Sequence, residues 1–134
     1  MMILCWNCRG LGRPRKVQEL VRLVHAQHPK ILFLSETRQN KRFVEGLRWR
    51  LGLHNVVSYI EEGKGGGLAL FWDESVDVEL FKLGERIIDV FICNMPSGIK
   101  WRCTFVYGEP RTHLRHLMWD LMRKMKNLTS PDHG

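Results

Sequence analysis

Three apolar segments of the sequence end on polar side chains whose types suit metal and phosphate chemistry. MMILCWN ends on Asn7, ILFLSE ends on Glu36, and WRCTFVY ends on Tyr107. In α/β proteins ligands bind beyond the strand ends, where the loops diverge. An amide, a carboxylate and a phenol gathered there could hold both a Mg²⁺ ion and a phosphate. Mg²⁺ prefers carboxylate oxygens and keeps several waters. Taken singly, each residue also fits an ordinary turn or a core aromatic.

The cysteines do not point to redox or zinc chemistry. Cys5 and Cys8 form a C-x-x-C pair, but Cys5 lies inside an apolar run rather than at the start of a helix. A zinc site would need a second close pair, and Cys93 and Cys103 are ten residues apart. No secretory leader precedes them. We therefore expect buried, reduced thiols in an intracellular protein.

The elements that must position the polar residues follow from apolar periodicity. The predicted strands are residues 2–7, 31–35, 56–60, 68–72, 76–80, 87–93 and 101–107. A helix begins near Pro14 and ends at His28, before Pro29, and its apolar residues recur at helical spacing. Asn40 caps a second helix that Gly52 closes. A last helix begins at Thr112. A strand, a helix and a strand in sequence predict a parallel pair under a covering helix.

Length and charge set the class of protein. The chain has 134 residues, which predicts one domain, 1–134. Lys and Arg outnumber Asp and Glu by 21 to 14, for a formal charge of +7. Such a charge favours nucleic acid as a partner, because a basic surface releases counterions from phosphates; an ordinary basic domain is the alternative. No apolar run approaches the roughly 20 residues that cross a bilayer, so we expect no membrane partner.

Four local motifs in order resemble one family. They are ILCWNCRGLG, FLSETR, GGLALFW and WRCTFVYGEPR. Together they resemble the endonuclease/exonuclease/phosphatase superfamily, with the deoxyribonuclease-I-like fold, and most of all the endonuclease domain of plant LINE-type retrotransposons. The resemblance runs from Met2 to about Leu128. It implies Mg²⁺-dependent hydrolysis of phosphodiester bonds in DNA.

The resemblance also implies roles for single residues. Asn7 matches the residue that helps to hold metal or phosphate, Glu36 matches the metal-binding glutamate, and Tyr107 matches the tyrosine that contacts the scissile phosphate. Arg38 and Arg111 lie beside these positions, and from their charge we expect them to contact the DNA backbone.

The second half of the family pattern is missing from these residues. There is no GDFN-type Asp and Asn, and the Asp132-His133 pair follows a predicted helix directly, so its likeness to the family's final Asp-His pair is a coincidence. The implied fold is the N-terminal half of a four-layer α/β/β/α sandwich, a C-terminally truncated domain. It would have a mixed sheet with helices on one face and a second sheet that is largely missing. The uncovered sheet face would expose an apolar patch and allow self-association.

The resemblance therefore implies a fragment of a DNA endonuclease for retrotransposon target nicking, which we expect to be inactive as it stands and nuclear if functional. One alternative is a non-catalytic basic module that binds nucleic acid. Another keeps the superfamily but acts on a phosphorylated small molecule or lipid, which the motifs CWNCRGLG and YGEPR disfavour. The glycine run from Lys64 to Gly67 fits a flexible hairpin turn better than a phosphate cradle, because it lacks P-loop spacing.

Overall fold

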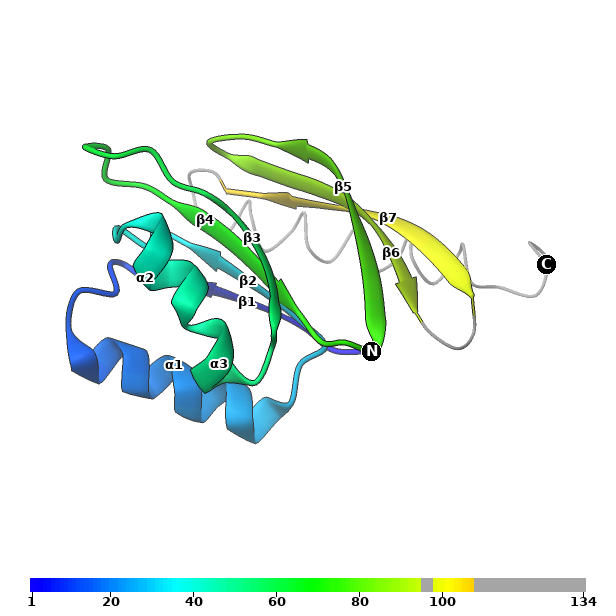
Figure 1. Cartoon of the computed structure of the whole chain (residues 1–134), viewed down its shortest axis with the longest axis horizontal. Helices are drawn as coiled ribbons and strands as arrows, with labels where there is room; N and C mark the ends of the chain where they lie inside the picture. The colour runs from blue at the N-terminus through cyan, green and yellow to red at the C-terminus, as the bar shows by residue number, and fades with distance from the viewer. Residues whose placement is uncertain (95–97, 108–134) are drawn as a thin grey trace. The chain divides into compact units, whose positions relative to one another are not determined.

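A computed structural model describes residues 1–94 and 98–107, and the chain divides into two compact units, Met1–Ser75 and Val76–Gly134 (Figure 1). The first unit contains β1 Ile3–Asn7, α1 Pro14–Gln27, β2 Ile31–Ser35, α2 Lys41–Gly46, α3 Arg48–Leu51, β3 Asn55–Tyr59 and β4 Leu68–Trp72. The second contains β5 Val76–Leu83, β6 Ile87–Asn94 and β7 Ile99–Val106. Each unit is described by itself.

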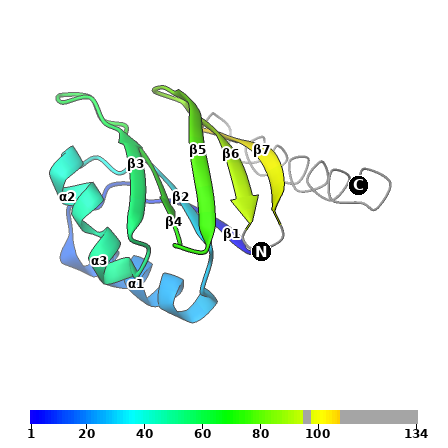
Figure 2. The same cartoon turned by 45° about the vertical axis from the view of Figure 1, so that its right-hand side comes forward.

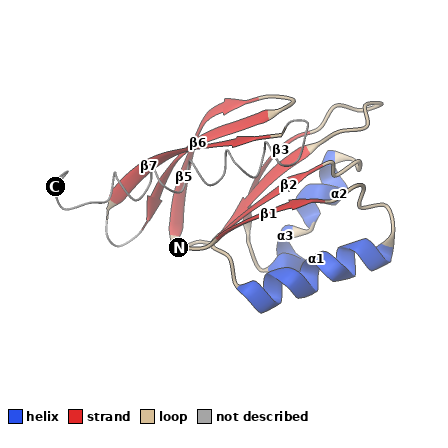
Figure 3. Ribbon diagram, turned by 180° about the vertical axis from the view of Figure 1, so that it is seen from behind, coloured by secondary structure: helices blue, strands red, loops and turns tan. Residues whose placement is uncertain are grey.

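The first unit is a mixed sheet with helices on one face (Figure 3). Its strand order is β1-β2-β4-β3, with β1 parallel to β2 and with β4 antiparallel to β2 and β3. The predicted parallel pair under a helix is thereby confirmed. Alternate residues of β2 and β4 pack against the helices in one apolar core, whose buried members include Val17, Leu20, Val24, Leu32, Leu34, Val44, Leu47, Leu51, Ala69 and Phe71.

Helix α1 begins and ends where the sequence predicts. Pro14 occupies the start of the helix, where a missing N–H costs nothing. His28 ends it in the left-handed conformation, with its N–H donating to the carbonyl of Val24 at 2.9 Å. Pro29 follows at once, and the residue before a proline avoids the helical region. This ending turns the chain back so that β2 can lie beside β1.

The face of the first sheet opposite the helices is also apolar and buried. Ile31 and Leu70 are fully buried, and Phe33 and Leu68 are 2% and 1% exposed. The exposed apolar patch expected from the sequence is therefore not found at these positions. That part of the expectation was wrong, and this sheet face gives no reason to expect self-association.

The second unit is an antiparallel sheet of order β5-β6-β7, drawn in green to yellow in Figure 2. Ile88, Val90 and Ile92 form a fully buried row along β6. β5 reaches Leu83, three residues beyond its predicted end, because a register shift between Leu80 and Lys82 lets the pairing continue. The second sheet is thus represented by three strands, and the fold is mixed α/β as predicted. The predicted helix from Thr112 lies outside the described residues.

Candidate active site

Asn7 and Glu36 lie at neighbouring strand ends on one edge of the first sheet. The parallel register pairs Asn7 with Ser35, and Glu36 is the next residue along the chain. The N–H of Cys8 donates to the carbonyl of Ser35 at 2.8 Å, so the two strands stay joined where they end. The structure therefore places Asn7 and Glu36, the two residues that the sequence singled out, at the ends of neighbouring strands.

The backbone around Glu36 holds an uncommon conformation. Arg9, Glu36 and Arg38 have positive φ angles of 50°, 51° and 53°, a region that costs a non-glycine residue about 1–2 kcal/mol. Neighbouring hydrogen bonds hold it in place. The carbonyl of Glu36 accepts from the N–H of Gly10 at 2.8 Å, and the carbonyl of Thr37 accepts from Leu11 at 3.0 Å. Such strain, held by tertiary contacts, is typical of functional sites.

The β3–β4 hairpin forms the other side of this support. The N–H groups of Thr37 and Arg38 donate to the carbonyls of Gly67 at 3.3 Å and Gly66 at 2.9 Å. Gly67 has a φ of 117°, and a Cβ there would overlap the Thr37 hydroxyl oxygen. Thr37 is fully buried. The glycine run is therefore a hairpin, as predicted, but it also allows a close approach that sequence reasoning missed. The signal was the closely spaced glycines themselves.

The two candidate side chains are already oriented by local hydrogen bonds. The Nη2 of Arg38 donates to the Oε1 of Glu36 at 3.0 Å. The Glu36 side chain is 16% exposed and the Arg38 side chain 49%. The Oδ1 of Asn7 accepts from the N–H of Arg9 at 3.0 Å, which fixes the turn after β1. The carboxylate therefore lies in a largely covered position with a cation beside it.

Burial disfavours the ionised form of the two thiols on and just after β1. Burial raises the pKa of Cys8 to about 12; the cation of Lys16 lowers it and the carboxylate of Glu36 raises it. Burial alone raises the pKa of Cys5 to about 12. Both are free thiols. The prediction of buried cysteines is confirmed for Cys8 and Cys103, whereas Cys5 and Cys93 are only partly buried.

The remaining candidate residues are Tyr107 and Arg111. Tyr107 directly follows β7 in the second unit, where its N–H donates to the carbonyl of Arg86 at 2.8 Å. Arg111 lies outside the described residues. The convergence of all three strand ends on one pocket therefore stays a prediction.

The donor atoms at the edge fit part of a magnesium site. Among the residues that the structure describes, no group of three His, Cys, Asp or Glu side chains is placed to hold a metal ion. Mg²⁺ commonly uses only one or two protein carboxylates and takes its other ligands from water and substrate phosphate. Glu36 with the amide oxygen of Asn7 is compatible with that pattern.

No helix in the described part of the chain is long and apolar enough to cross a membrane.

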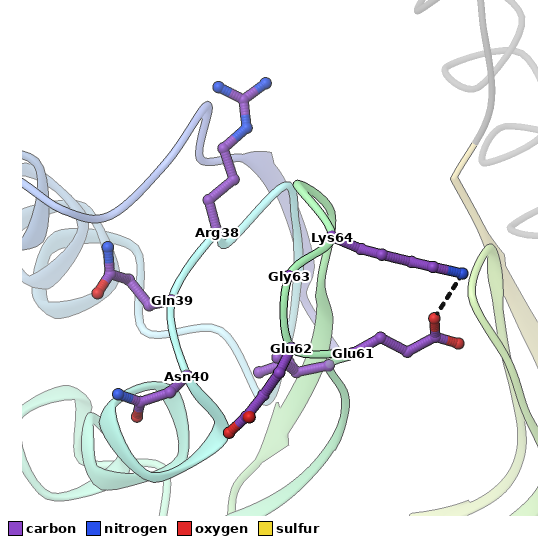
Figure 4. A pocket seen from close by; sticks show the side chains of 8 residues that line it. Arg38, Gln39, Asn40, Glu61, Glu62, Gly63 and Lys64 are labelled. Carbon is purple, nitrogen blue, oxygen red and sulfur yellow. Dashed lines mark ion pairs between the residues drawn. The ribbon is translucent and has the colours of Figure 1, made fainter.

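A polar cavity lies beside the loop that follows Glu36 (Figure 4). Its volume is about 260 Å³, and it is lined by Arg38, Gln39, Asn40 and residues 60–64. The Oδ1 of Asn40 accepts from the N–H of Phe43 at 2.7 Å, which confirms the predicted helix cap. On the hairpin side of the cavity, Lys64 forms an ion pair of 2.8 Å with Glu61. The edge thus carries both a carboxylate and an adjoining polar recess.

Known proteins share this sequence pattern and this architecture. The sequence matches the model of the Endonuclease/Exonuclease/phosphatase family over residues 4–131. No curated protein matches the chain. Among solved structures, TDP2 from C. elegans is 20% identical with a TM-score of 0.53, over 96% of this chain and 44% of its own. The AP endonuclease LMAP from Leishmania major is 17% identical with a TM-score of 0.54, over 90% and 46%. The chain therefore spans less than half the length of these two proteins.

The family match runs through both compact units. At such low sequence identities, similarity to the two solved structures is evidence for the fold alone. The mixed sheet and the antiparallel sheet are consistent with part of a deoxyribonuclease-I-like fold. The match over nearly the whole sequence carries the classification: this chain belongs to the endonuclease/exonuclease/phosphatase family.

Proposed function

We propose that these residues are the N-terminal half of a Mg²⁺-dependent DNA endonuclease domain of the plant LINE retrotransposon type. The observation that carries the proposal is the position of Asn7 at the end of β1 and of Glu36 directly after the end of the adjacent strand β2, where backbone hydrogen bonds join the flanking loops. A ligand on a packed strand end is held more firmly than one on a free loop. The retrotransposon assignment is supported by the motifs CWNCRGLG and YGEPR.

The roles of the residues follow from their chemistry. Glu36 would hold the metal, with the amide oxygen of Asn7 beside it. A bound Mg²⁺ would neutralise charge on the scissile phosphate during phosphodiester hydrolysis. Tyr107 would contact that phosphate, and Arg38 and Arg111 would contact the DNA backbone through charge-assisted hydrogen bonds. Arg38 already bonds Glu36, so phosphate and carboxylate would compete for it.

The 134 residues by themselves are proposed to have little or no nicking activity. They contain neither the GDFN-type motif nor an Asp-His pair in the family context. Loss of general acid–base catalysis alone typically removes about 10²–10⁴-fold of the rate. The location that goes with the proposal is intracellular, and nuclear for a domain that nicks chromosomal DNA. Self-association is an untested prediction.

A non-catalytic nucleic-acid-binding module is the second candidate. The formal charge of +7 favours it, as does the ion pair that Glu36 makes with Arg38. Such a module would bind DNA in a salt-dependent manner without using the Glu36 carboxylate as a metal ligand.

Metal binding and nicking together test the proposal. Mn²⁺ binding, followed by electron paramagnetic resonance, should be weak in the wild-type chain and lost in Glu36→Gln. Glu19→Gln, which alters an exposed carboxylate on α1, should bind as the wild type does. Nicking of supercoiled plasmid with Mg²⁺ should not exceed that in chelator. Mn²⁺ binding unchanged in Glu36→Gln would refute the ligand role, and nicking that Glu36→Gln abolishes would refute the proposed inactivity.

A further inference from the structure

Helices α2 and α3 present aromatic side chains to solvent. Phe43 is 40% exposed and Trp49 is 64% exposed, the highest value among the large apolar side chains that the structure describes. The segment has its own buried side, formed by Val44, Leu47 and Leu51. Trp49 is therefore not part of this buried side, and an exposed tryptophan outside the core is a candidate contact residue.

Basic residues flank both rings along the sequence. The surface is made of Lys41, Arg42, Phe43, Arg48, Trp49 and Arg50, and we call it the basic aromatic strip. The guanidinium carbon of Arg48 lies 4.9 Å from the centre of the Trp49 ring. The one acidic residue between positions 41 and 51, Glu45, accepts a hydrogen bond of 2.7 Å from the hydroxyl of Ser58. The strip therefore carries positive charge that fits a polyanion.

Neighbouring groups fix the strip in place. The ring of His54 lies 5.1 Å from that of Trp49, at an interplanar angle of 44°. The Nε2 of His25 on α1 lies 2.9 Å from the carbonyl oxygen of Arg50. Beyond the end of α3 is a cavity of about 300 Å³ whose lining includes His25, His28 and Lys30. A chain laid along the strip would meet a recess there.

We propose that the basic aromatic strip binds single-stranded nucleic acid. Proteins that bind single strands combine a cationic track for phosphates with aromatic side chains on which bases stack. Lys41, Arg42 and Arg50 supply the track, and Trp49 with Arg48 against it supplies the stacking platform. In a duplex the base faces are stacked on one another, so only an unpaired strand has bases that can stack on Trp49. The strip belongs to the helix layer, and its function does not depend on Glu36.

Fluorescence anisotropy with labelled oligothymidylate and the full chain tests this inference. Trp49→Ala should weaken binding roughly 5- to 150-fold, the range for loss of one stacked base. Trp49→Phe should retain most of the affinity because a ring remains. The plot of log K against log salt should be less steep for Arg50→Ala, with a slope smaller in magnitude by about 0.7, because one phosphate contact is lost. Circular dichroism checks that each variant is folded, as the exposure of these side chains leads us to expect.

Two control variants separate the strip from the general charge of the protein. Arg22→Ala removes an exposed arginine from α1, and Glu19→Gln removes an exposed carboxylate from the same helix; both should bind oligothymidylate as the wild type does. Equal affinity in Trp49→Ala and wild type would overturn the proposal. So would tighter binding to a matched duplex than to the single strand, or no binding of the wild-type chain to oligothymidylate.

Discussion

At the scale of single residues, the site depends on how Glu36 shares its charge. Its carboxylate is largely covered, and Arg38 is the cation beside it. A metal ion and a guanidinium compete for the same oxygens, so the ion pair both orients the carboxylate and weakens its affinity for metal.

Replacing Arg38 by alanine tests that competition. We expect Arg38→Ala to bind Mn²⁺ more tightly, by up to about fivefold, since a partly exposed ion pair contributes at most about 1 kcal/mol. Isothermal titration calorimetry without DNA measures this directly. Arg22→Ala on α1 serves as the control for net charge. Weaker Mn²⁺ binding in Arg38→Ala would show that the arginine preorganises the site instead of competing for it.

The two amino-terminal cysteines should be unreactive in the folded protein. Their pKa values are raised to about 12 by burial, whereas an exposed thiol has a pKa of about 8.5. Alkylation by iodoacetamide near neutral pH, located by peptide mass spectrometry, should modify Cys5 and Cys8 only after the protein is unfolded. Rapid modification of either thiol in the native protein would contradict the raised pKa values.

At the scale of elements, the support of the site lies in the contact between the β3–β4 hairpin and the loop after β2. Gly67→Ala should destabilise the protein by at least about 1–2 kcal/mol, because alanine is strained at positive φ and its Cβ would overlap Thr37. Gly65→Ala is the matched control, since a Cβ there meets no atom within 4 Å. Urea unfolding gives both free energies. Equal stability of the two variants would argue against the close approach.

The elements themselves were largely predictable from sequence, and the contacts between loops were not. Apolar periodicity, Pro14 and the Asn40 cap located α1, α2 and β2 because these signals act within a few residues. The left-handed conformations of Glu36 and Arg38 have no local signal, because their backbone partners are distant in sequence: Gly10 donates to the carbonyl of Glu36, and the carbonyl of Gly66 accepts from Arg38. For the same reason, the sequence indicated Asn7 and Glu36 as candidates but did not predict the contact between the β3–β4 hairpin and the loop after β2.

At the scale of the whole molecule, acid should weaken the protein through Asp89. The ion pair with Arg102, and next the hydrogen bond from Thr104, hold the pKa of this carboxyl below its ordinary value, against the effect of burial. A depressed folded pKa contributes stability that is present above the unfolded pKa of about 3.9 and is lost as the pH falls through the folded pKa. Asp89→Asn should therefore lose less stability than the wild type on acidification.

Thermal unfolding followed across acidic and neutral pH checks this prediction. The wild-type Tm should fall more steeply than that of Asp89→Asn below about pH 4. Asp77→Asn, an exposed carboxylate on β5, is the control and should follow the wild-type curve. Parallel curves for the wild type and Asp89→Asn would show that the ionised carboxylate of Asp89 does not stabilise the folded protein.

The left-handed backbone at Arg9, Glu36 and Arg38 bears on any engineering of this chain. Glycine or asparagine would relax each of these positions. A library selected for heat resistance alone would therefore enrich such replacements, and the most robust survivors would be those that had discarded the carboxylate. Thermostability and metal chemistry are set against each other here, so selection should score both properties together.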